Sequence, residues 1–186
     1  MAGKKSEVRV IKMNEIIKAM VERRSTRSYQ NEMLPKEVID DIIKAGLYAA
    51  SGRNYQSAVI IAVTDRAMRD RLSEMNRKIG GWSEGFDPFY NAPVVLVVLA
   101  DKSRPTYLYD GSLVMGNLML AAHSMGIGSC WIHRAKEEFE SEEGREILKS
   151  LGIEGEYEGI GHCILGYADS DCIKIPERKS DRVYFI

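Results

Sequence analysis

Three arginines and two hydroxyl residues stand together in the stretch 23–27, which reads Arg-Arg-Ser-Thr-Arg. A guanidinium group offers a planar fork of donors that matches phosphate oxygens, and nearby hydroxyls can add further hydrogen bonds. The chemistry that these residues suit is therefore the binding of a small phosphorylated group. The stretch also follows residues 13–22, whose apolar spacing is helical, and arginines at the C-terminus of a helix stabilise its dipole. From this motif alone, a phosphate site and a solvated helix end both remain open.

Composition makes any anion site a local feature. The chain has 186 residues, with 26 basic and 27 acidic side chains and a formal net charge of −1. No basic field covers the surface, so nucleic acid is not an expected partner. The longest strongly apolar run, residues 93–100, is far shorter than the roughly 20 residues of a membrane span. It predicts a buried strand, and no membrane partner is expected.

The ends of the chain and its cysteines indicate one cytoplasmic domain. Residues 1–12 carry charges throughout and lack the apolar centre of a signal peptide, so they predict a loose leader before a single domain at 13–186. The three cysteines form no C-x-x-C pair, and Cys130 and Cys163 stand in apolar sequence typical of core thiols. The three histidines lack metal-ligand spacing, so no metal site is expected.

Helical and strand patterns alternate along the chain, which predicts a mixed α+β or α/β fold with helices around one sheet. The predicted elements are helices at 13–22, 34–50, 65–78, 109–125 and about 137–151, and strands at 58–63, 93–100 and 160–165. A glycine-containing turn at 126–132 follows the fourth helix, and Gly126 can end that helix in a left-handed conformation. No G-x-G-x-x-G or G-x-x-x-x-G-K-[ST] motif occurs, so neither a Rossmann dinucleotide site nor a P-loop is predicted.

The helix at 109–125 is apolar on nearly every side, so it must be buried all round. One possibility is that part of it packs against a second subunit, with Gly116 permitting close approach. The other is a central helix in a single core, where Asn117 and His123 would need polar partners. A separate question concerns the loop before residue 93, which carries four aromatic residues. They either line a pocket or fasten a long loop to the body: Trp82, Phe86, Phe89 and Tyr90.

Several stretches together resemble the nitroreductase family of flavoenzymes. Residues 23–27 match its R-[RH]-S-x-[RK] motif, and residues 49–57 are similar to its A-P-S-A-x-N-x-Q-P motif. Residues 92–95 match an A-P-V-V strand, and residues 126–132 match a G-L-G-S-C-W-I turn. The order and spacing agree from residue 13 to the C-terminus, and this joint agreement favours the phosphate interpretation of the arginines.

The resemblance implies a three-layer α+β sandwich, with a mostly antiparallel central sheet flanked by helices, in a domain-intertwined homodimer. Two FMN sites would lie at the subunit interface. The residues implied at the flavin phosphate or ribityl chain are Arg23, Arg24, Ser25, Arg27 and, from the tail, Arg178. Those implied near the ring and ribityl hydroxyls, from the partner subunit, are Ser51, Gly52 and Asn54. Those implied to lie along the ring through their backbone are Gly128, Ser129 and Cys130.

The function that the resemblance implies is an FMN-dependent oxidoreductase. Hydride would pass from NAD(P)H through flavin N5 to an electron-poor acceptor, such as a nitroaromatic or a quinone, in a ping-pong mechanism without a catalytic side chain. Two prolines and an aromatic of the family pattern are missing around residues 49–58, which predicts a less rigid ring-binding loop. Two alternatives remain. One is a flavin-binding or flavin-consuming protein of this fold without nicotinamide turnover, and the other is a structural dimer whose arginines are surface charge.

Overall fold

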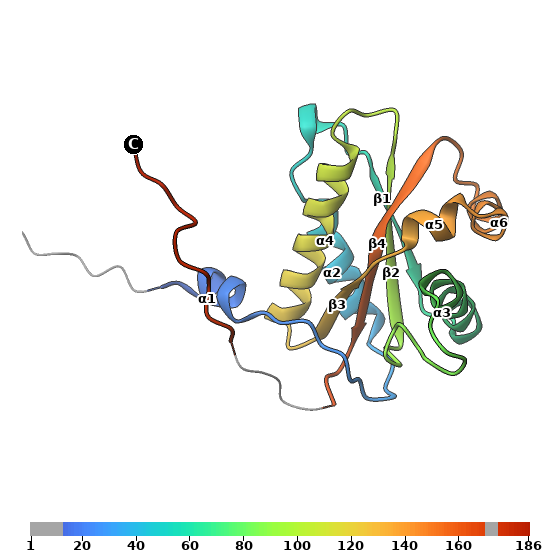
Figure 1. Cartoon of the computed structure of the whole chain (residues 1–186), viewed down its shortest axis with the longest axis horizontal. Coiled ribbons are helices and arrows are strands. Elements are labelled where there is room, and N and C mark those ends of the chain that lie inside the picture. Colours follow the sequence, from blue (N-terminus) through green and yellow to red (C-terminus); the bar gives the residue numbers. More distant parts are fainter. Residues whose placement is uncertain (1–12, 170–174) are drawn as a thin grey trace, which may run out of the picture.

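The centre of the molecule is a four-stranded antiparallel sheet, seen in a computed structural model that describes residues 13–169 and 175–186 (Figure 1). The predicted leader, residues 1–12, lies outside the described residues. The strands, in the spatial order β1-β2-β4-β3, are β1 (Ala58–Val63), β2 (Val94–Asp101), β4 (Tyr157–Gly166) and β3 (Gly128–Ile132). All three pairings are antiparallel, and β2 and β4 change register at Val98/Leu99. The expected antiparallel sheet is confirmed.

Helices cover both faces of this sheet, which gives three layers (Figure 1). One face carries α2 (Lys36–Leu47) and α4 (Tyr107–Ser124), and α1 (Glu15–Glu22) lies against α4. The other face carries α3 (Arg66–Gly80), α5 (Ala135–Glu140) and α6 (Glu142–Ser150). Strand β2 lies inside the sheet and is covered on both sides, so Val94 to Ala100 are fully buried. No helix within the described ranges is long and apolar enough to cross a bilayer.

Two of the predicted elements were wrong in detail. The single helix expected at about 137–151 is two helices, because Ser141 adopts an extended conformation and its hydroxyl accepts from the Gly144 N–H at 3.0 Å. A serine cap begins α6 there, and a Cβ on Gly144 would lie 2.1 Å from the Glu138 carbonyl oxygen. The expected turn at 126–132 is mostly strand β3, because it pairs with β4. Gly126 does end α4, with φ 75°.

The two cysteines predicted as core thiols are buried, one on each face of the sheet. Cys130 packs in the core under α3, α5 and α6, whereas Cys163 packs under α2 and α4. Burial raises the pKa of the Cys163 thiol well above its usual range. The Cys163 thiol is therefore a protonated packing group, and both cysteines fill the core.

Helix α4 is not buried all round within one chain. Its inner face is buried at Met115 and Leu118, but Leu113 is 50% exposed and Tyr109 is 73% exposed. Asn117 has the polar partner that burial requires, because its Nδ2 donates to the Ala45 carbonyl oxygen at 3.0 Å. A Cβ on Gly116 would have no atom within 4 Å. The alternative of a helix enclosed in a single core is wrong, because one apolar face of α4 is open.

The long loop before β2 is fastened to the body by a buried ion pair. Arg69 of α3 is buried, donates to the Ala92 carbonyl oxygen at 3.0 Å and pairs with Asp87. Asp87 also accepts from the Ser73 hydroxyl at 2.5 Å and from the Phe89 N–H at 2.9 Å. Burial acts to raise the pKa of the Asp87 carboxyl, but hydrogen bonds from Arg69 and Ser73 outweigh it and hold that pKa below its usual range.

We expect Asp87→Asn to lower the free energy of unfolding by about 2 kcal/mol at neutral pH, because the buried Arg69 guanidinium keeps only the more exposed Asp70 as a carboxylate partner. A carboxyl whose pKa is lowered by folding stabilises the protein above the ordinary aspartate pKa of about 4, and this contribution is lost as the pH falls. The difference between wild type and variant should shrink on acidification, as measured by chemical denaturation. The exposed Asp40→Asn is the control. A difference that does not change with pH would contradict this account.

Candidate functional site

The arginine cluster, residues 23–27, lies beside strand β3. The Thr26 N–H donates to the Ser129 carbonyl oxygen at 2.9 Å, and Ser25 forms a parallel bridge with Ser129. A Cβ on Gly128 would lie 2.9 Å from the Thr26 side chain, so glycine permits this close approach. The structure therefore brings together two of the predicted site segments, 23–27 and 128–130.

The guanidinium groups at this junction are only partly satisfied. One nitrogen of Arg24 donates to the carbonyl oxygens of Val21, at 2.8 Å, and of Arg23, at 2.5 Å, so this arginine does cap the end of α1. The remaining buried donors have no partner among the described residues: Nη1 of Arg23, Nε and Nη2 of Arg24 and the Ser129 hydroxyl. Buried donors without acceptors are costly, so this arrangement indicates a ligand with several acceptor oxygens. Arg27 is exposed at the edge of the cluster.

The second predicted segment, residues 51–57, is held by a residue that the sequence interpretation missed. Asp110, buried in the first turn of α4, accepts from the Gly52 N–H at 3.0 Å and the Ser57 hydroxyl at 2.9 Å. The Thr106 hydroxyl donates to the same carboxylate at 3.0 Å. An acidic residue within an otherwise apolar helix was the signal that could have revealed this role. Four hydrogen-bonding groups thus meet at the start of α4.

The backbone of this loop is unusual. Arg53, Asn54 and Gln56 all have positive φ, at 50°, 57° and 48°, and the Gln56 N–H donates to the Ser51 hydroxyl at 3.1 Å. Left-handed conformations at residues other than glycine are costly and concentrate at functional sites. A Cβ on Gly52 would lie 2.4 Å from the Thr106 hydroxyl oxygen. The loop is fixed by these contacts, which replace the rigidity that the missing prolines would have given.

The two predicted halves of the site lie at opposite ends of α4. The turn Gly52–Asn54 lies near the N-terminus of α4, whereas β3 follows its C-terminus (Figure 1). The helix between Asp110 and Ser124 spans about 20 Å. Arg178 is exposed and forms no hydrogen bond or ion pair with any described residue. One chain therefore does not bring Ser51, Gly52 or Asn54 to the arginine cluster.

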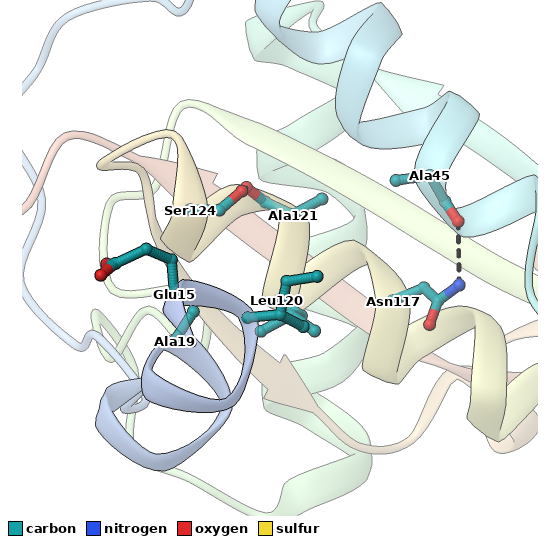
Figure 2. A pocket seen from close by; sticks show the side chains of 8 residues that line it. Glu15, Ala19, Ala45, Asn117, Leu120, Ala121 and Ser124 are labelled. Atoms are coloured by element: carbon teal, nitrogen blue, oxygen red, sulfur yellow. Dashed lines mark hydrogen bonds between the residues drawn. The ribbon is translucent and has the colours of Figure 1, made fainter. Parts of the chain in front are cut away.

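An apolar surface surrounds the arginine end of α4. A pocket of about 380 Å³ lies between α1, α2 and α4. Figure 2 shows Ala19 of α1, Ala45 of α2 and Leu120 of α4 among the side chains that line it. Helix α1 also exposes Ile16, which lines the pocket, and Met20, and α4 exposes Leu113. Exposed apolar surface of this kind marks an interaction face.

Within the described ranges, no three metal-ligating side chains come together.

Comparison with known proteins agrees with these features. Residues 20–167 match the family model described as "Nitroreductase family". The chain belongs to the nitroreductase family. A nitroreductase from Bacteroides fragilis, solved with bound FMN, superposes with a TM-score of 0.86 at 27% identity, covering 94% of this chain and all of that one. The resemblance drawn from the motifs and the three-layer fold are both confirmed.

Two curated relatives of this nitroreductase-family chain come from Archaeoglobus fulgidus and Bacillus subtilis. The first, provisionally named NADH dehydrogenase/NAD(P)H nitroreductase, is 34% identical over 141 residues, or 73% of this chain and 77% of the relative. The second, an FMN reductase [NAD(P)H], is 29% identical over 140 residues, or 63% of this chain and 53% of the relative. The chain therefore spans about half the length of the second relative.

We expect Asp110→Asn to lower the free energy of unfolding by about 2 kcal/mol, because one carboxylate oxygen that accepts hydrogen bonds becomes a donor. The loss of stability should be largest in the loop at residues 51–57. Hydrogen exchange of the Gly52 amide should therefore quicken more than exchange in the strands. Glu146→Gln, an exposed change on α6, is the control. Unchanged protection of the Gly52 amide would show that Asp110 does not hold the loop.

Proposed function

We propose that this chain is an FMN-dependent oxidoreductase that takes hydride from NAD(P)H and passes it to an electron-poor acceptor, such as a nitroaromatic or a quinone. The observation that carries the proposal is the set of buried, unpartnered donors on Arg23, Arg24 and Ser129. These donors suit the phosphate of FMN, which the Bacteroides fragilis protein of the same fold binds. The use of NAD(P)H is supported by two relatives that are named as NAD(P)H-dependent reductases.

The residues present fit a flavin phosphate. A dianionic phosphate held by these nitrogens of Arg23 and Arg24 would satisfy donors that have no acceptor within residues 13–169 and 175–186. Ser25 and Arg27 stand in the same cluster and would add a hydroxyl and a further positive charge. The flavin ring would then extend along the backbone of Gly128, Ser129 and Cys130, beside the bridge between Ser25 and Ser129. The exposed tail would bring Arg178 to the phosphate.

The second half of each site would come from a second copy of the chain, in an intertwined homodimer. The exposed apolar faces of α1 and α4 supply a surface for this contact. A two-fold axis across α4 would place the N-terminal end of one α4 beside the C-terminal end of the other. The partner's Ser51, Gly52 and Asn54 would thereby approach the arginine cluster, which no single chain achieves.

The chain's own part in the reaction is to bind FMN, to orient it and to shield it from water. Bound FMN supplies the hydride chemistry, in a ping-pong cycle that nicotinamide and acceptor enter in turn. The arginine cluster holds the anionic end, backbone groups of β3 and the partner's loop define the ring position, and the dimer interface excludes water. No side chain is assigned as a proton donor. The buried free thiols of Cys130 and Cys163 support a cytoplasmic location.

The protein should purify yellow, with FMN released by acid. Anaerobic mixing with NADH or with NADPH should bleach the flavin absorbance, because hydride transfer reduces the ring, and adding a quinone should restore the absorbance. Bound flavin that neither nucleotide bleaches would instead support the flavin-binding alternative. A colourless protein that does not take up FMN would support the structural dimer.

We expect Leu113→Glu to convert the dimer to monomers and to lower FMN occupancy at least tenfold, because a charge would be buried in the contact and the partner's loop would be lost. Light scattering and flavin absorbance measure the two effects on one sample. Leu151→Glu changes a similarly exposed leucine after α6, on the other face of the sheet, and should affect neither. A monomeric Leu113→Glu variant with full flavin would contradict the shared site.

A further inference from the structure

A second pocket, which is lined by several charged side chains, lies where strand β3 ends. It has a volume of about 440 Å³, within the range of small-ligand sites, and its lining includes His133, Arg134 and Lys136. Strand β3 connects this pocket to the arginine cluster, and its five residues span about 16 Å. The pocket thus lies at the opposite end of β3 from the phosphate donors.

The turn that carries the pocket is strained and firmly held. Arg134 has a φ of 80°, a left-handed conformation that glycine would adopt without cost. The Asn76 amide donates to the His133 carbonyl oxygen at 2.8 Å, and the Glu138 N–H donates to the Arg134 carbonyl oxygen at 3.0 Å. Asn76 and Glu138 are fully buried, and Glu138 also contacts His162 at 3.0 Å. A strained arginine on such a rigid support indicates that its side chain is needed at this position.

The Arg134 guanidinium stacks on an aromatic ring from the long loop. Its central carbon lies 4.4 Å from the centre of the Trp82 ring. The Trp82 ring in turn packs over Gly80, where a Cβ would lie 2.5 Å from it, and lies 5.1 Å from the Phe86 ring. Phe89 is fully buried and fastens the loop, whereas Trp82 contacts the Arg134 side chain, which lines the pocket. Of the two expected roles of the aromatic loop, Phe89 therefore has the fastening role, and none of the four rings lines this pocket.

The charges around the pocket leave one cation without a fixed partner among the described residues. Lys136 is paired with Glu158 at 3.2 Å and lies 4.0 Å from Glu140. Arg134 has no carboxylate within ion-pair distance in residues 13–169 and 175–186. Glu137 also lines the pocket, so its negative charge limits the anion that the pocket accepts. A single carboxylate suits this balance better than a dianionic phosphate does.

We propose that Arg134, held in place by its stacking on Trp82, forms an acceptor subsite that selects molecules bearing one carboxylate. The stacked guanidinium binds the carboxylate, and the apolar Ile160 side chain in the pocket lining contacts the rest of the acceptor. This inference rests on the proposed function, because it is the acceptor that enters the pocket beyond the flavin ring on β3. It goes further in naming the chemical class of that acceptor and the residue that selects it.

The first test compares 4-nitrobenzoate with the neutral 4-nitrobenzamide as acceptors for the FMN-loaded protein. The wild type should prefer the carboxylate in kcat/KM, and Arg134→Gln should reduce that preference about tenfold, mainly through KM, because one charge-assisted contact is lost. Arg71→Gln, which removes a surface arginine paired with Glu143, should leave the preference unchanged. An unchanged preference in Arg134→Gln would overturn the proposal. A change in the NADPH-to-NADH ratio instead would assign Arg134 to the nucleotide phosphate and would also overturn it.

The second test does not depend on turnover. Titration of the FMN-loaded protein with sodium benzoate should change tryptophan fluorescence, because the anion binds the guanidinium stacked on Trp82. Trp82→Phe should abolish the change, and Arg134→Gln should weaken benzoate binding about tenfold. No fluorescence response in the wild type would refute the subsite. Failure of nicotinamide to bleach the flavin would refute the proposed function, and the fluorescence titration would still report on the subsite.

Discussion

Buried guanidinium nitrogens require acceptors, and this requirement at Arg23 and Arg24 determines what a ligand of the site must supply. The end of α1 supplies carbonyl oxygens for one nitrogen of Arg24 only. The other buried donors of Arg23 and Arg24 have no acceptor among the described residues, and neither does the Ser129 hydroxyl. A phosphate would satisfy them together, and it needs neither a glycine-rich loop nor a helix N-terminus. The missing dinucleotide and P-loop motifs are consistent with this way of holding an anion.

Helix α4 gives the site its second constraint. Its N-terminal end fixes the strained loop 51–57 through Asp110, and its C-terminal end leads through Gly126 into β3. The two functional segments are therefore attached to one rigid rod, about 20 Å apart. A second copy of the chain that packs on the exposed apolar face of α4 can bring its own loop 51–57 to the arginine cluster of the first. In this account, dimer formation and cofactor binding are one event.

Much of this arrangement followed from the sequence, and the exceptions have physical reasons. The apolar run at 93–100 predicted the central strand because both its faces are buried, and the R-R-S-T-R motif predicted donors for an anion. The break at Ser141 was missed because a serine within a polar helical pattern gives no strong signal until its hydroxyl caps the next helix. Asp110 was missed because its three partners come from distant or irregular segments. The pocket at Arg134 was missed because its turn is held by Asn76, which lies 57 residues away in sequence.

The shared site is tested most directly by subunit complementation. Arg24→Gln damages the phosphate half, and Gly52→Ala damages the loop half, since its Cβ would overlap the Thr106 side chain. Each variant homodimer should hold little FMN. A heterodimer of the two variants, isolated through two different tags, contains one undamaged site and should bind about one FMN per dimer. Flavin that stays as low in the heterodimer as in both homodimers would contradict a site built from two chains.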